Sequence, residues 1–309
     1  MSAVDLEQAS RETIRKGSQS FAAAAALFNA ETRADAEMLY AWCRHCDDVI
    51  DGQQLGHGMA TPDEATASQR LTSLYAKTRA ALAGEPTDDP DFAAFQRVAL
   101  RRRIPERYAI ELLDGFAMDV MARRYETLDD TLDYCWHVAG VVGVMMALVM
   151  GVEPDDLATL RRAQDLGLAF QLTNIARDVV EDAANGRIYQ PAQWLAEAGV
   201  PEAEIAAPSH RAALFAVTQR LLATAEPYYA SALAGLPELP FRSAWAIAAA
   251  RGVYRQIGVI VLQRGAAAWD ERASASSAMK AWLALQGGWT ALRSRGAKAA
   301  PRPGLWSKI

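Results

Sequence analysis

Two clusters of acidic residues, one in each half of the chain, constrain its fold more than any other feature. The first is Asp-Asp-Val-Ile-Asp at residues 47–51, and the second is Arg-Asp-Val-Val-Glu-Asp at residues 177–182. Each lies in a stretch that reads as a buried amphipathic helix, where neighbouring carboxylates repel one another and lose their hydration. Cations must therefore lie between the two clusters to neutralise them.

Apolar residues recur at the three- and four-residue spacing of helices along nearly the whole chain, whereas the alternation of apolar and polar residues that is typical of strands is scarce. Pro and Gly gather between the periodic segments, and no shift in composition marks a linker between independent domains. We therefore expect an all-α protein in which residues 1–290 form a single large bundle around a central cavity. Residues 291–309 are expected to be a basic, flexible tail.

The charge of the chain argues against binding to nucleic acids. The 32 Lys and Arg residues and 37 Asp and Glu residues give a formal net charge of -5, and the tail is basic, so the rest is more acidic still. We expect no nucleic-acid partner. The basic tail could contact an anionic membrane surface, although a solvated terminus is the simpler interpretation.

Residues 134–152 contain no Asp, Glu, Lys or Arg and are long enough to span a membrane. Acidic residues flank them on both sides with no adjacent Lys or Arg, so a buried core helix is the better interpretation. Three cysteines are too few for a disulfide framework, and acidic residues interrupt any N-terminal leader. These features predict a cytoplasmic protein. Any association with a membrane is expected to be peripheral.

Successive residues of an α-helix are rotated by about 100° around its axis, so residues three, four or seven apart lie on one face. Each acidic cluster belongs to such a row of residues, called a stripe here. The first stripe contains Tyr40, Arg44, Asp47, Asp48 and Asp51, and Gly52 is expected to end its helix. The second stripe contains Gln171, Asn174, Asp178 and Asp182, with Arg177 beside it.

These residue types are suited to magnesium, which prefers oxygen ligands and commonly bridges carboxylates to phosphate oxygens. The predicted metal ligands are Asp47, Asp48, Asp51, Asn174, Asp178 and Asp182. Arg44 and Arg177 could contact a diphosphate and stabilise the negative charge that grows as it leaves. The reaction implied is ionisation of an allylic diphosphate, whose carbocation needs a dry pocket. Residues 134–152 and the alanine-rich run after Phe21 could line that pocket.

The two stripes resemble the aspartate-rich signatures of the squalene and phytoene synthase family, the head-to-head prenyl synthases. The first signature reads Tyr40-Ala41-x-x-Arg44-x-x-Asp47-Asp48-x-x-Asp51. The second reads Gln171-x-x-Asn174-x-x-Arg177-Asp178-x-x-Glu181-Asp182 and continues into Gly186-Arg187-Ile188-Tyr189-x-Pro191. Weaker matches are Ser18-x-Ser20-Phe21, Tyr134-Cys135-x-x-Val138-Ala139-Gly140 and, late in the chain, Tyr254, Arg272 and Lys280. The resemblance therefore covers roughly residues 11 to 285.

This resemblance implies a class I isoprenoid synthase bundle with a prenyl-binding cavity. The substrate-binding residues implied are Ser18, Ser20, Phe21, Tyr40, Arg44, Gln171, Asn174, Arg177, Arg187, Tyr254 and Arg272. The catalytic residues implied are Asp47, Asp48, Asp51, Asp178, Asp182, Arg44, Arg177, Tyr40, Tyr134 and Tyr254.

The activity implied is head-to-head (1'-1) condensation of two geranylgeranyl diphosphates, through prephytoene diphosphate, to phytoene. It would need Mg²⁺ or Mn²⁺ and no NADPH, and other enzymes of carotenoid synthesis are candidate partners. Three alternatives remain open: a squalene or dehydrosqualene type of synthase that uses farnesyl diphosphate, a class I terpene cyclase, and a non-catalytic helical assembly factor. The cyclase usually has Ser or Thr where Asp178 stands, and the assembly factor tends to lose the aspartates.

Overall fold

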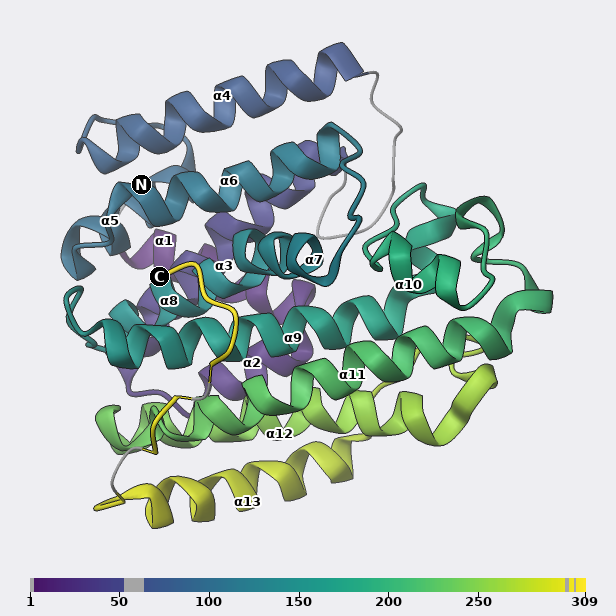
Figure 1. The fold of residues 1–309 in the computed structure, drawn as a ribbon. Helices are drawn as coiled ribbons and strands as arrows, with labels where there is room; N and C mark the ends of the chain where they lie inside the picture. Colours follow the sequence, from purple (N-terminus) through teal and green to yellow (C-terminus); the bar gives the residue numbers. More distant parts are fainter. Residues whose placement is uncertain (1–2, 53–63, 298–299, 303) are drawn as a thin grey trace.

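The computed structural model describes residues 3–52, 64–297, 300–302 and 304–309, which contain helices and turns and no strand (Figure 1). The first helices are α1 (Ala3–Gly17), α2 (Gln19–Ala25), α3 (Ala30–Asp51), α4 (Glu64–Leu82), α5 (Pro90–Arg102), α6 (Glu106–Val120), α7 (Leu128–Cys135) and α8 (Val141–Val149). They are followed by α9 (Leu157–Ala184), α10 (Ala192–Glu197), α11 (Arg211–Leu233), α12 (Phe241–Arg264) and α13 (Ser277–Ser294). The predicted all-α class is confirmed.

The two helices that carry the acidic stripes begin and end where their sequences provide caps. Asn29 accepts a hydrogen bond from the backbone N–H of Thr32 (2.9 Å) at the start of α3, and Asp156 accepts one from Thr159 (3.1 Å) at the start of α9. As predicted, Gly52 ends α3, in a left-handed conformation (φ 63°) that glycine adopts without strain. Local sequence thus determines where both stripes lie along their helices.

Helix α9 is the axis of the bundle, with α8 packed on one side of it and α11 and α12 on another (Figure 1). Glycines let α9 approach the segment between α7 and α8 closely. A Cβ atom on Gly167 would lie 2.3 Å from the carbonyl oxygen of Ala139, and one on Gly143 would lie 2.5 Å from that of Ala163. Any larger residue at these two positions would push the helices apart.

Two helical stretches among the described residues have the length and hydropathy of a membrane span, Leu128–Val149 and Phe241–Ala267. In the first, which joins α7 to α8 through a π-helical turn at Trp136–Gly140, 67% of the most apolar window is buried inside the bundle. Burial at this level agrees with the interpretation of residues 134–152 as a core helix.

The C-terminal segment differs from the flexible tail expected for residues 291–309. Helix α13 continues to Ser294, and the described residues beyond it pack along α9 (Figure 1). Arg302 donates hydrogen bonds to both carboxylate oxygens of the fully buried Asp165 (2.7 and 2.9 Å), and Lys308 pairs with Asp133 (2.8 Å). A buried carboxylate requires a cationic partner, and here the tail provides it.

Replacing Gly167 with Ala should destabilise the fold by about 3 kcal/mol, because the new methyl group would overlap a backbone carbonyl that cannot rotate away. Urea denaturation followed by circular dichroism measures the change. Gly304→Ala is the matched control, since nothing lies within 4 Å of its Cβ position. Equal stability of the two variants would contradict the close approach of α9 to Ala139.

Candidate active site

A cavity of about 460 Å³ lies at the centre of the bundle. It follows α9 from Asn174 back to Thr159, fifteen residues or about 22 Å at the rise of an α-helix. Most of its wall is apolar and includes Ala24, Ala25, Val142, Met146, Leu166, Phe170, Leu236, Leu239 and Ile247. A cavity of this size and lining suits an elongated hydrocarbon chain.

Most of the polar lining lies where the two acidic stripes meet the cavity, while Thr159 and Arg162 are polar lining residues near the start of α9. Helix α3 contributes Tyr40, Arg44 and Asp47, and α9 contributes Gln171 and Asn174. Further polar lining residues are Asp119, Tyr134, Arg187, Tyr189 and Tyr254. The stripes, which are separated by half of the sequence, therefore contribute residues to the same cavity.

Arginines neutralise the carboxylates of the first stripe. Arg44 donates to Asp47 (2.6 Å) and lies 3.7 Å from Asp48, while Arg187, from the loop after α9, donates to both oxygens of Asp51. Burial, together with repulsion from the neighbouring carboxylates, outweighs the effect of Arg44 and raises the pKa of Asp47 to about 7. Arg44 therefore offsets only part of the cost of ionising Asp47 at this position.

In the second stripe, two neighbouring carboxylates have opposite pKa shifts. Burial opposes ionisation of Asp178, but hydrogen bonds from Arg177 (Nε to Oδ1, 2.8 Å) and Arg272 (3.1 and 3.2 Å) hold its pKa below the usual value. One turn further along α9, burial and repulsion from Asp178 raise the pKa of Asp182 to about 8. An added cation would favour the ionised form of Asp182.

The donor atoms fit a hard divalent cation. The side-chain Oδ1 of Asn174 is buried and has no hydrogen-bond partner among the described residues, while its Nδ2 donates to Gln171 (3.3 Å). An acceptor oxygen left unpaired inside a protein needs a ligand or a water molecule. Asp47 lines the same cavity, and Asp178 and Asp182 follow Asn174 at four-residue steps along α9, so the nearby side chains offer the oxygen donors that Mg²⁺ or Mn²⁺ prefers.

Aromatic rings cover the cavity between the two stripes. The ring of Tyr254 stacks on Phe170 (centroids 4.1 Å apart) and lies 5.6 Å from Phe21, which in turn lies 6.0 Å from Tyr40. The hydroxyl of Ser18 accepts a hydrogen bond from the backbone N–H of Phe21 (3.3 Å) and so caps α2. The side chain of the other predicted serine, Ser20, lies outside the described residues.

A half-buried carboxylate that the sequence analysis did not select lies in the same cavity. Asp119 of α6 accepts hydrogen bonds from the hydroxyls of Tyr134 (3.1 Å) and Tyr189 (3.0 Å), whose rings stack on each other (centroids 4.5 Å apart). Burial raises the pKa of Asp119 to about 6. Its spacing from Leu112 and Phe116 on the apolar face of α6 was the signal that could have identified it.

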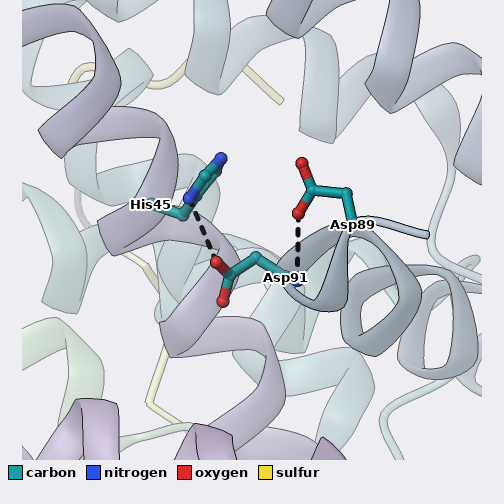
Figure 2. Close-up of side chains that lie close together, drawn as sticks. All are labelled: His45, Asp89 and Asp91. Carbon is teal, nitrogen blue, oxygen red and sulfur yellow. Dashed lines mark hydrogen bonds and ion pairs between the residues drawn. The ribbon is translucent and has the colours of Figure 1, made fainter. Parts of the chain in front are cut away.

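A third group of possible metal ligands lies between α3 and α5. His45, Asp89 and Asp91 bring their ligand atoms within 4.8 Å of one another, and His45 Nδ1 lies 3.0 Å from Asp91 (Figure 2). The ammonium of Lys77 already binds Asp89 (2.9 Å), and Asp89 also caps α5. This ionic cluster holds α3, α4 and α5 together, and its residues do not line the cavity.

A largely apolar cavity in a helical bundle, lined by residues from two stripes of metal-binding residue types, is the arrangement of the class of enzymes that act on prenyl diphosphates. The squalene/phytoene synthase family model matches residues 14–278. The chain belongs to this family, whose members are divalent-metal-dependent prenyl diphosphate enzymes, and the resemblance inferred from the stripes is confirmed.

Curated relatives and solved structures agree with this assignment. The chain is 57% identical to a 15-cis-phytoene synthase of Enterobacter agglomerans, over 94% of this chain and 98% of the relative. It is 56% identical to one of Pantoea ananas, over 96% of each. A crystal structure of a dehydrosqualene synthase in complex with a ligand superimposes with a TM-score of 0.81, at 25% identity, over 94% of this chain and 97% of that one.

The affinity for Mn²⁺ should fall at least about tenfold between pH 8 and pH 6, because protons then compete for carboxyl groups with raised pKa values, Asp47 at about 7 and Asp182 at about 8. Calorimetric titration at the two pH values measures this change. Asp182→Asn should show a shallower dependence. An affinity that does not change with pH would show that neither carboxylate binds the metal.

Proposed function

We propose that this protein condenses two molecules of geranylgeranyl diphosphate head to head, through prephytoene diphosphate, to phytoene. Two diphosphates and two protons leave, and no reductant is consumed. The observation that carries the proposal is that Asp47 of the first stripe and Gln171 and Asn174 of the second line the same largely apolar cavity. Identities of 56% and 57% to 15-cis-phytoene synthases over nearly the whole chain support the choice of substrate and product.

The metal ions proposed are Mg²⁺, with Mn²⁺ as a substitute, held by Asp47, Asp48, Asp51, Asn174, Asp178 and Asp182. When bound, they would draw negative charge away from the departing diphosphate. Arg44, Arg177, Arg187 and Arg272, which contact the carboxylates of the two stripes, are well placed to donate hydrogen bonds to the diphosphate oxygens. Gln171 would orient Asn174 through their hydrogen bond.

The apolar wall would exclude water from the carbocations that follow each ionisation. Tyr40, Tyr254, Phe21 and Phe170 present ring faces or edges beside the carboxylates, where a cation can be stabilised by the electrons of the ring. We propose that Tyr134 orients the intermediate together with Tyr189, since both hydroxyls are fixed by Asp119.

We also propose that the protein acts in the cytoplasm, at the surface of a membrane that receives its hydrocarbon product. Three free cysteines, two of them buried, are consistent with a reducing compartment. Other enzymes of carotenoid synthesis remain the proposed partners.

Incubation of the purified protein with geranylgeranyl diphosphate and Mg²⁺ should yield phytoene without NADPH, and EDTA should abolish the product. Mass spectrometry of the extracted hydrocarbon identifies it. Farnesyl diphosphate, supplied in a parallel reaction, should be used poorly. A thirty-carbon hydrocarbon as the main product would favour the dehydrosqualene type of synthase, and a cyclic terpene would favour a cyclase.

Asp47→Asn and Asp178→Asn should each lower turnover by about a hundredfold or more, because each removes charge that stabilises the metal-bound transition state. Steady-state kinetics with geranylgeranyl diphosphate measure the loss, and circular dichroism checks the fold. Asp88→Asn, at an exposed carboxylate, is the matched control and should retain wild-type turnover. Full activity in both cavity variants would rule out the assignment of the metal ligands.

A further inference from the structure

Four large apolar side chains lie exposed in a row along α13: Trp282, Leu285, Trp289 and Leu292. Each is more than half exposed, and their spacing of three, four and three residues places them within an arc of about 80° on the helix. The opposite side of α13 is buried against α12 through Leu283, Gly287 and Ala291. We refer to the four exposed side chains as the α13 apolar row.

Exposed apolar residues elsewhere in the described part of the chain are scattered. Leu100 and Met121, for example, lie on or after other helices, in α5 and just after α6. Single exposed apolar side chains are normal on protein surfaces, whereas a contiguous row that includes two tryptophans marks an interaction site. Phe241, at the start of α12, is also exposed and extends the apolar surface beside the C-terminal end of α13.

Basic residues outnumber acidic ones around the α13 apolar row. Helices α12 and α13 contain no Asp or Glu, although the whole chain carries a net charge of -5. The guanidinium of Arg293 lies over the ring of Trp289 (6.0 Å) and that of Arg295 over the ring of Phe241 (5.9 Å). Glu238, in the turn that packs against α13, is the acidic residue on the adjoining element. Basic side chains therefore border the row, which suits an anionic partner.

We propose that the α13 apolar row docks the protein on the surface of lipid bilayers that contain anionic lipids. A helix with tryptophan and leucine on one face, arginine at the edge of that face and no Asp or Glu within it has the pattern of a helix that lies in the plane of a membrane interface. Arg293 and Arg295 would contact the headgroups while the row enters the acyl boundary.

The docking surface lies one helix away from the cavity. Trp245 of α12 donates a hydrogen bond to the carbonyl oxygen of Ala284 in α13 (2.7 Å), while its neighbours Ala246, Ile247 and Ala250 line the cavity. Docking through α13 would thus bring the apolar part of the cavity next to the bilayer. The lipid contact assigns a surface to the membrane location proposed above, and its consequence for the hydrocarbon product rests on the proposed reaction.

Flotation of the full-length protein with vesicles tests the proposal. The wild-type protein should float with vesicles of phosphatidylcholine and phosphatidylglycerol, and less with phosphatidylcholine alone or at high salt. Leu285→Ser combined with Trp289→Ser should lower the partition coefficient at least about tenfold. Leu100→Ser combined with Met121→Ser is the matched control and should float like the wild type. Arg293→Gln combined with Arg295→Gln keeps the row and should remove the preference for anionic lipid.

Activity in detergent micelles separates this proposal from the proposed function. All variants should make the wild-type amount of product there, which also shows that they fold. Flotation without phytoene formation would leave the docking surface intact and reject the proposed reaction. Equal flotation of the wild type and the α13 double variant, or no flotation of the wild type, would reject the docking surface. A wild-type dimer in light scattering that the α13 double variant loses, without flotation, would assign the row to a second copy.

Discussion

The structure depends on the cost of placing several carboxylates side by side at the edge of an apolar cavity. Repulsion and desolvation raise the pKa values of Asp47 and Asp182 far above those of exposed carboxyl groups. Arginines offset part of this cost, since Arg44 binds Asp47 and Arg187 binds Asp51. The arginines do not lower the pKa values of Asp47 and Asp182 to the usual range, so a divalent cation that favours their ionised forms suits this end of the cavity in the proposed reaction.

The rest of the cavity is mostly apolar and suits a hydrocarbon chain rather than charged groups. Its wall is built mostly from small and apolar residues, among them Gly143 and Gly167, where α9 closely approaches α8 and the turn before it. A cation formed beside the carboxylates therefore meets aromatic rings and alkyl groups. The same cavity can promote loss of diphosphate at one end and protect a reactive hydrocarbon along the remainder.

Helix α12 links this interior to the outer surface of the protein. One side of it lines the cavity with Ala246, Ile247 and Ala250, and another side packs against α13. Helix α13 in turn buries Gly287 against Ala249 and leaves its tryptophans in solvent. These successive layers place a surface suited to lipid close to a cavity suited to a lipid-like substrate, which is economical for an enzyme whose product is insoluble in water.

The sequence by itself determined the helices, the two acidic stripes and the buried stretch at residues 134–152, because each depends on spacing within a single helix. The end of α3 at Gly52 and the cluster of ligands from Asp47 to Asp51 follow from the same local rule. The contacts between distant residues were decided only by the packing of helices. Asp119 meets Tyr134 and Tyr189, Arg187 reaches Asp51 across 136 positions, and Arg302 reaches Asp165 across 137. No local pattern encodes such pairs, since the side chain that faces a buried charge is chosen by how whole helices fit together.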